Sequence, residues 1–151
     1  MPERPLRLLF VCTGNACRSQ MAEGWARHLG GKRVEARSAG IEAHGLNPRA
    51  VAVMAEAGVD IAGQQSTRLT PEMLEWADVV ITVCGHADEH CPVLPPGTRK
   101  RHWPLEDPAR ARGDESEVMA VFRASRDVIR DQVRDLLEEL GIQTGDSDDE
   151  Q

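Results

Sequence analysis

Short apolar runs and helix-spaced apolar positions alternate along this chain. The run Leu6–Cys12 is too short for a helix and predicts a buried strand. Apolar and β-branched residues over 34–39 and 79–83 predict two more strands, and residues 99–103 are the candidate for a fourth. The sheet is therefore expected to have four strands.

Helical signals separate these strands. The spacing of apolar residues predicts a helix over residues 21–29, which two glycines end. An asparagine followed by proline opens a helix over 47–58, and a threonine followed by proline opens a short one that runs to residue 74. One apolar face marks a long final helix over 118–140. Strands alternating with helices predict an α/β fold, a three-layer α/β/α arrangement around a parallel sheet.

Length and charge narrow the class of protein. The 151 residues fit one domain, which we assign to 1–141, followed by an acidic tail over 142–151 that we expect to be disordered. The net charge of −7 argues against binding of nucleic acid or an anionic membrane surface, although four of the acidic residues lie in the tail. No apolar run is long enough for a membrane span or a signal peptide, so we expect a cytoplasmic protein. A compact monomer is the default expectation for its oligomeric state. Four cysteines in that compartment favour reactive or metal-binding thiols over structural disulfides.

The stretch after the first strand carries the strongest chemical signal. Cys12 and Arg18-Ser19 flank a five-residue loop between a strand and a helix. Such a loop curls so that backbone N–H groups surround a tetrahedral oxyanion, and the helix start and the guanidinium add positive charge. We expect Cys12 to be a thiolate in that field, with the Ser19 hydroxyl donating to it. The predicted anion-binding residues are Thr13, Gly14, Asn15, Ala16, Cys17, Arg18 and Ser19, with the Cys17 side chain packed beneath the helix.

This strand, loop and helix resemble the low-molecular-weight protein tyrosine phosphatase fold. In that family an aspartate before a proline protonates the leaving group, and Asp107-Pro108 is the only such pair in this chain. An aspartic acid near the bound anion suits that role.

A second cysteine-bearing segment runs from Cys84, at a predicted strand end, to Cys91. If the segment were helical, the two Cα atoms would be about 10 Å apart. A disulfide needs them within roughly 7 Å, so a Cys84–Cys91 bond requires the segment to unwind. The pair is therefore a candidate redox switch.

Wider similarity points to the thioredoxin-coupled arsenate reductases. It extends over nearly the whole chain before the tail, through matching segments at residues 11–15, 20–25, 38–48, 82–85, 91–92, 102–103 and 107–110. The resemblance implies that Cys12 attacks arsenate, that Arg18 holds it and that Asp107 protonates the departing oxygen. It further implies that Cys84 and then Cys91 relay the oxidation, and that thioredoxin reduces the final disulfide.

The same resemblance raises the question of a potassium ion. The family positions match Asn15, Glu23 and Ser38, but Thr67 stands where a fourth, aspartate position would be. No other cofactor is expected. Pro104 and Glu106 also depart from the glycine and aspartate of close relatives, although Asp107 itself is retained.

Two other functions compete. A phosphatase would use the same loop, but the chain has no tyrosine to place beside a phosphotyrosine site. A zinc-binding regulatory protein would use Cys84, His86, His90 and Cys91 as ligands. His90 and Cys91 are adjacent, however, and converge poorly on one tetrahedral centre with the other two.

Overall fold

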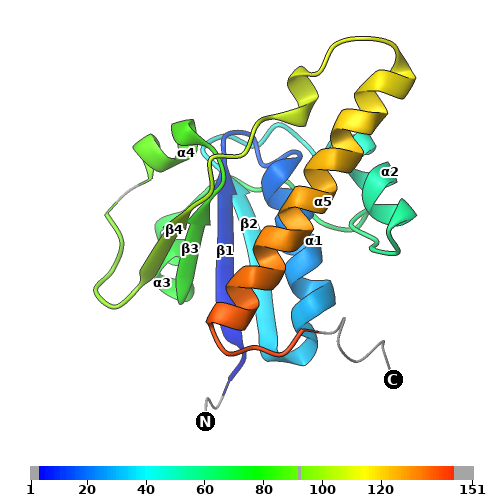
Figure 1. The fold of residues 1–151 in the computed structure, drawn as a ribbon. Helices are drawn as coiled ribbons and strands as arrows, with labels where there is room; N and C mark the ends of the chain where they lie inside the picture. Colours follow the sequence, from blue (N-terminus) through cyan, green and yellow to red (C-terminus); the bar gives the residue numbers. More distant parts are fainter. Residues whose placement is uncertain (1–3, 92, 145–151) are drawn as a thin grey trace.

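A computed structural model describes residues 4–91 and 93–144 of the chain (Figure 1). Strands and helices alternate as the pattern predicts. In chain order the elements are β1 (Leu6–Cys12), α1 (Arg18–Gly30), a 3-10 turn (Gly31–Arg33), β2 (Val34–Gly40), α2 (Pro48–Glu56), α3 (Pro71–Trp76), β3 (Val79–Thr82), α4 (Gly85–His90), β4 (Arg99–His102), a 3-10 turn (Pro108–Arg110) and α5 (Glu115–Glu139).

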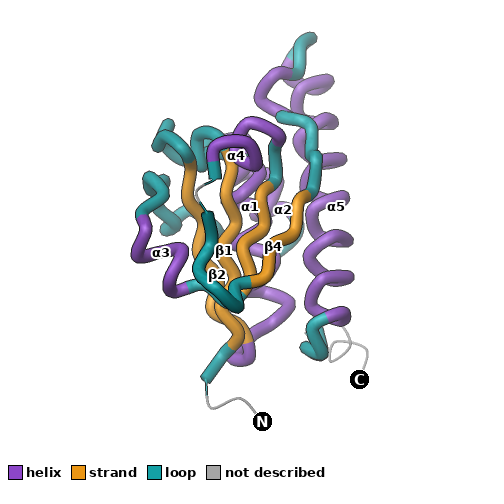
Figure 2. Tube along the Cα trace, turned by 90° about the vertical axis from the view of Figure 1, so that its left-hand side faces the viewer, coloured by secondary structure: helices purple, strands orange, loops and turns teal. Residues whose placement is uncertain are grey.

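The four strands form one parallel sheet in the order β2-β1-β3-β4. Helices α1, α2 and α5 cover one face, and α3 lies on the other (Figure 2). The predicted three-layer α/β/α fold is therefore confirmed. Because β1 is central and pairs with β2 and β3, its last residue, Cys12, lies in the middle of the carboxyl edge. Ligands of open parallel sheets bind at that edge.

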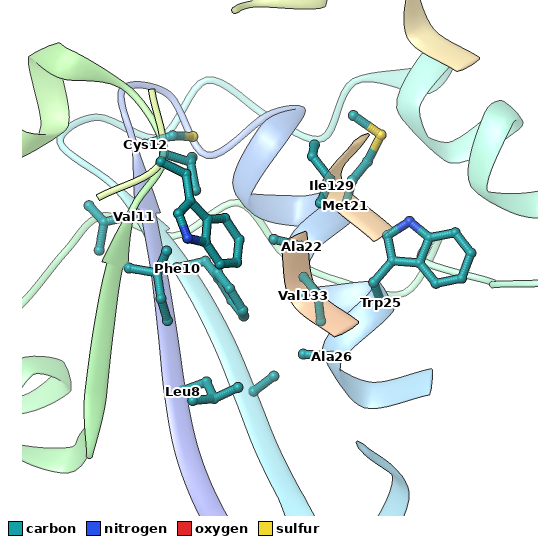
Figure 3. Packing of buried hydrophobic residues seen from close by; sticks show 14 of the residues in the cluster. Leu8, Phe10, Val11, Cys12, Met21, Ala22, Trp25, Ala26, Ile129 and Val133 are labelled. Atoms are coloured by element: carbon teal, nitrogen blue, oxygen red, sulfur yellow. The ribbon is translucent and has the colours of Figure 1, made fainter. Parts of the chain in front are cut away.

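One side of the core lies between β1 and helices α1 and α5 (Figure 3). Leu8 to Val11 are fully buried, as are Met21 of α1 and Ile129 of α5. The Phe10 and Trp103 rings lie 5.9 Å apart between centroids, at a tilt of 44°. Each large apolar side chain buried in this way stabilises the fold by about 1.5–3 kcal/mol. Cys12 thus sits on a strand that has little freedom to move.

Local sequence explains where the helices begin. Asn47 and Thr70 accept hydrogen bonds from the first turns of α2 and α3, as their N-cap positions predict. The long helix starts three residues earlier than its apolar pattern indicates. There Asp114 and Glu117 form a capping box, in which each side chain accepts from the other residue's backbone N–H. That signal was present in the sequence, but it lies outside the apolar stripe.

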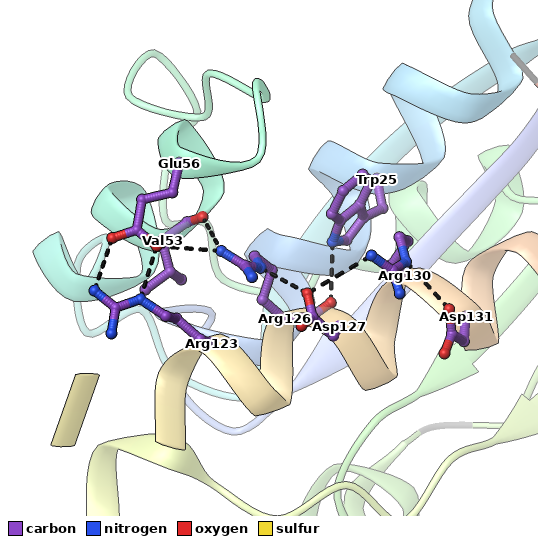
Figure 4. A network of polar contacts seen from close by, with 8 residues as sticks. All are labelled: Trp25, Val53, Glu56, Arg123, Arg126, Asp127, Arg130 and Asp131. Carbon is purple, nitrogen blue, oxygen red and sulfur yellow. Dashed lines mark hydrogen bonds and ion pairs between the residues drawn. The ribbon is translucent and has the colours of Figure 1, made fainter. Parts of the chain in front are cut away.

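Helix α5 is tied to α2 by ion pairs (Figure 4). Glu56 accepts from Arg123 at 2.8 and 2.9 Å and pairs with Arg126 at 3.3 Å. The Arg126 carbonyl accepts from Trp25 Nε1 at 3.1 Å, which adds a bond to α1. Because Arg123 and Glu56 are each more than 40% exposed, the main effect of these pairs is alignment of the helices rather than stability.

The end of the chain stays with the domain longer than the composition predicts. The Ile142 N–H donates to the Leu137 carbonyl at 2.7 Å, and Thr144 is 5% exposed. The first residues assigned to the tail therefore belong to the body of the domain, and 145–151, with the acidic cluster, lie outside the described residues. Within the described part of the chain, no helix has the length and apolar character needed to cross a membrane.

Candidate active site

The loop between β1 and α1 has an unusual backbone at Asn15, whose φ of 50° is left-handed. Three contacts hold it there. The Asn15 carbonyl accepts from Gln20 Nε2 at 3.0 Å, its side-chain Oδ1 accepts from the Thr67 N–H at 2.7 Å, and its Nδ2 donates to Ser19 Oγ at 2.8 Å. Asparagine tolerates this conformation better than most residues. The loop is therefore held in shape by buried hydrogen bonds.

Gly40, at the end of β2, allows the loop to pack against the sheet. A Cβ on this residue would lie 2.2 Å from the Glu42 carbonyl oxygen and 2.7 Å from the Asn15 nitrogen. Those atoms are backbone and cannot move aside. The close approach brings the loop beside residues 41–44, whose N–H groups donate to the Cys12, Thr13 and Gly14 carbonyls.

Cys12 is 2% exposed and receives hydrogen bonds from its own loop. The Asn15 backbone N–H donates to Cys12 Sγ at 3.2 Å, and Ser19 Oγ lies 2.8 Å from the same sulfur. Because the Asn15 amide already donates to Ser19 Oγ, the Ser19 hydroxyl proton is left to point at the sulfur. Two hydrogen-bond donors therefore point at this one sulfur.

Arg18 and Asp107 meet across the mouth of the loop. Arg18 Nη1 donates to the Leu105 carbonyl at 3.0 Å, and Nη2 lies 3.7 Å from Asp107 Oδ2. The other Asp107 oxygen accepts from the Ala109 N–H at 3.0 Å, which fixes the carboxyl group at the start of the turn. The structure thus brings these two predicted residues together although they are 89 positions apart in the sequence.

Cys84 lies two residues after the end of β3 and faces the same loop. It is the N-cap of α4, and its sulfur accepts from the Ala87 N–H at 3.4 Å. Cys84 Sγ also lies 3.2 Å from Thr13 Oγ1. A loop threonine next to Cys12 therefore touches the second thiol directly.

The other two cysteines differ from this pair. Cys17 is 4% exposed, and its burial, followed by the charge of Asp107, raises the pKa of its thiol to about 12. It stays protonated, in keeping with the structural role expected of it. Cys91 is half-buried at the far end of α4, and burial raises the pKa of its thiol. All four cysteines are free thiols.

One cavity of about 630 Å³ joins these groups. Cys12, Arg18, Cys84 and Asp107 all line it, whereas Cys91 is not among its described lining residues. The sequence did not single out several other lining residues, namely His44, Asn47, Leu105, Ala109 and Arg110. They come from loops that sequence patterns do not place in space. His44 has a signal only in hindsight, because its ring packs where a Cβ on Gly14 would stand.

The oxygen atoms of the residues matched to a potassium site already have partners within the protein. Ser38 Oγ donates to Glu23 Oε1 at 2.6 Å, and Arg27 pairs with the other Glu23 oxygen at 2.6 Å. The Asn15 Oδ1 atom is occupied by the Thr67 N–H. Arg27 already supplies a positive charge to this carboxylate, so the donor set does not fit a potassium ion well.

This chain is similar to known proteins in both sequence and fold. The low molecular weight phosphotyrosine protein phosphatase family matches residues 7–145. The chain belongs to this family. The chain is 51% identical to the arsenate reductase of Bacillus licheniformis over 127 residues. This aligned region covers 84% of this chain and 91% of that protein.

Solved structures that this chain resembles include an arsenate reductase and a phosphatase. A thioredoxin-dependent arsenate reductase of Corynebacterium glutamicum superposes with a TM-score of 0.75 at 29% identity, over 93% of this chain and 64% of that one. This chain thus spans less than two thirds of that neighbour's length. An arginine phosphatase of Geobacillus stearothermophilus superposes with a TM-score of 0.73 at 31% identity, over 91% of this chain and 94% of that one. The fold alone therefore does not separate reductase from phosphatase.

The zinc alternative gains no support from the geometry. Of its four ligand candidates, the His86 side chain lies outside the described part of the structure. Among the described side chains, no three histidine, cysteine or acidic groups are placed to hold a metal ion.

Proposed function

We propose that this protein reduces arsenate to arsenite with three cysteines, as an arsenic detoxification enzyme coupled to thioredoxin. The observation that carries the proposal is the placement of the thiols. Cys12 lies in an anion loop, Cys84 shares its cavity and contacts Thr13, and Cys91 ends the helix that Cys84 begins. A phosphatase requires the first thiol only.

The first step forms a bond between sulfur and arsenic. Arsenate occupies the loop against Arg18, and the Cys12 thiolate attacks arsenic(V). One As–O bond breaks, and Asp107 gives its proton to the departing oxygen. Its carboxyl group lies close enough to Arg18 to reach an oxygen of the same anion. The product is a Cys12–arsenic adduct, and no electrons have yet been transferred.

The second step transfers two electrons. The Cys84 thiolate attacks Cys12 Sγ, so that an S–S bond forms and the S–As bond breaks. The electron pair of that bond stays on arsenic, which leaves as arsenite. The Ala87 N–H and Thr13 Oγ1 both lie within hydrogen-bonding distance of Cys84 Sγ, which holds this sulfur at the cavity.

The remaining steps restore the enzyme. Cys91 attacks Cys84 Sγ, which releases Cys12 as a thiolate and leaves a Cys84–Cys91 disulfide. The dithiol of thioredoxin then reduces that disulfide and supplies the two electrons by exchange. Cys91 suits contact with a protein reductant because it is half-exposed and lies outside the cavity. A relay that needs reduced thiols fits a cytoplasmic location.

Dedicated phosphatase activity is the second candidate. The loop and Asp107 suffice for phosphoryl transfer, and the arginine phosphatase neighbour shares the fold. However, the described lining of the cavity contains no phenylalanine, tyrosine or tryptophan to stack on a phosphotyrosine ring. Phosphatase chemistry also leaves Cys84 and Cys91 without a task.

The deciding experiment follows arsenate-dependent NADPH oxidation with thioredoxin and thioredoxin reductase. We expect the wild type to turn over, Cys12→Ser to be inactive and Cys91→Ser to stop after at most one turnover. Cys17→Ser is the matched control, since it removes a buried thiol of the same loop. Sustained turnover by Cys91→Ser would refute the relay. Hydrolysis of phosphorylated peptides without any arsenate-dependent oxidation would favour the phosphatase.

A further inference from the structure

A polar cluster joins α4, the helix between Cys84 and Cys91, to the sheet. Asp88, in the middle of α4, accepts from Thr82 Oγ1 at 3.1 Å and pairs with Lys100 Nζ at 2.5 Å. Thr82 Oγ1 also lies 2.8 Å from His102 Nδ1. Thr82 ends β3 and Lys100 belongs to β4, so one carboxylate links the short helix to two strands.

The cluster is partly buried. Thr82 is fully buried, and the Asp88 side chain is 34% exposed. The Lys100 ammonium group beside Asp88, followed by the Thr82 hydroxyl, lowers the pKa of that carboxyl, so Asp88 is charged at neutral pH. A hydrogen bond to a charged group is stronger than one between neutral groups.

This contact depends on α4 remaining a helix. Cys84 and Cys91 are seven residues apart and stand at its two ends, so about 10 Å separates their Cα atoms at the rise of a helix. A disulfide needs roughly 7 Å or less. Asp88 lies between the two cysteines, and its N–H donates to the Cys84 carbonyl at 3.1 Å. Joining the sulfurs must therefore displace the segment that carries Asp88.

We propose that Asp88 is a positioning residue whose contacts with Thr82 and Lys100 hold α4 in the dithiol form and thereby set the reduction potential of the Cys84–Cys91 couple. This inference rests on the proposed relay. The couple loses two electrons and two protons when its disulfide forms, and a dithiol such as that of thioredoxin returns them. Contacts present only in the dithiol form stabilise that form, which makes the disulfide a stronger oxidant. Thioredoxin then reduces it more completely.

The test measures the couple without arsenate or thioredoxin. Cys12→Ser protein, with and without Asp88→Asn, is equilibrated in mixtures of reduced and oxidised dithiothreitol, and thiols are trapped and counted by mass. We expect Asp88→Asn to shift the equilibrium about tenfold toward the disulfide, which is about 30 mV more negative. Lys100→Gln, on the exposed part of the cluster, should shift it in the same direction and keeps the buried Thr82 contact intact for folding.

Glu89→Gln is the matched control, because it removes an exposed carboxylate from the next position of the same helix. We expect a shift of less than roughly twofold, which is under about 9 mV. If Asp88→Asn shifts the equilibrium by less than threefold, by no more than Glu89→Gln does, or toward the dithiol, the positioning role is wrong although the relay stands. If the parent protein forms no Cys84–Cys91 disulfide at all, the relay itself fails.

Discussion

Removing the Ser19 hydroxyl would measure how far the loop activates its nucleophile. Ser19 is fully buried, and its oxygen lies 2.8 Å from Cys12 Sγ while accepting from the Asn15 amide at 2.8 Å. In Ser19→Ala the sulfur keeps the Asn15 backbone N–H at 3.2 Å and loses the hydroxyl. The alanine is smaller, and with the hydroxyl the Asn15 side-chain amide also loses its Ser19 acceptor.

The size of the effect follows from the charge on sulfur. A hydrogen bond to a charged group contributes about 1.5–3 kcal/mol. Each 1.36 kcal/mol corresponds to tenfold in rate, so kcat/KM for arsenate should fall by about 10- to 150-fold. The rate at which iodoacetamide alkylates Cys12 at neutral pH should fall as well, because that reaction also requires the thiolate.

Ser66→Ala provides the comparison. Its hydroxyl donates to the Gly14 carbonyl at 3.3 Å and accepts from the Gly45 N–H at 3.0 Å, so it supports the loop without touching the sulfur. We expect this variant to stay within roughly threefold of wild type, since its bonds join neutral groups. If Ser19→Ala is equally active and unfolds at the same urea concentration as wild type, the hydroxyl does not activate Cys12.

Three other changes test separate parts of the site. Asp107→Asn should lower kcat for arsenate reduction by about 100-fold, the loss of a general acid, and leave alkylation of Cys12 unaffected. Cys17→Ser should stay within roughly twofold of wild-type activity, because a thiol whose pKa burial raises to about 12 is not a nucleophile at neutral pH. The Arg4 guanidinium lowers the pKa of Asp78, so this group stabilises the fold above its unfolded value of about 3.9 and less as the pH falls. Urea titrations should show Asp78→Asn less stable than wild type near about pH 6, with a difference that shrinks toward about pH 3.

The central strand and the anion loop were predictable because their signals are local. An apolar run, a cysteine, five loop residues and an arginine occupy consecutive positions, and the structure keeps them in one strand, loop and helix. The predicted ends of the last two strands were also close to the observed ones. The last two strands end at Thr82 and His102, one residue before the predicted ranges do, although the N–H groups of Val83 and Trp103 still donate to the neighbouring strands.

Contacts between distant segments were not predictable in the same way. Nothing in the residues around Leu105 indicates that its carbonyl accepts from Arg18. The pattern of residues does not indicate helix α4, because the helix has only six residues and most of them are polar. It forms where Cys84 caps it and Asp88 binds the sheet. Arg27 is the clearest case. Its pairing with Glu23 follows from a one-turn spacing in α1, yet its bearing on an ion site depends on Ser38 of another strand.

The shared character of the anion loop has a consequence for the cell. A ring of loop atoms and one guanidinium recognise the shape and charge of a tetrahedral oxyanion, and phosphate has both. Selection between arsenate and phosphate then takes place after binding, because a thiol can reduce arsenic(V) and cannot reduce phosphorus(V). Phosphate therefore acts as a competitor that occupies the enzyme without consuming its thiols. The rate at which a cell clears arsenate would depend on the ratio of arsenate to phosphate rather than on arsenate alone.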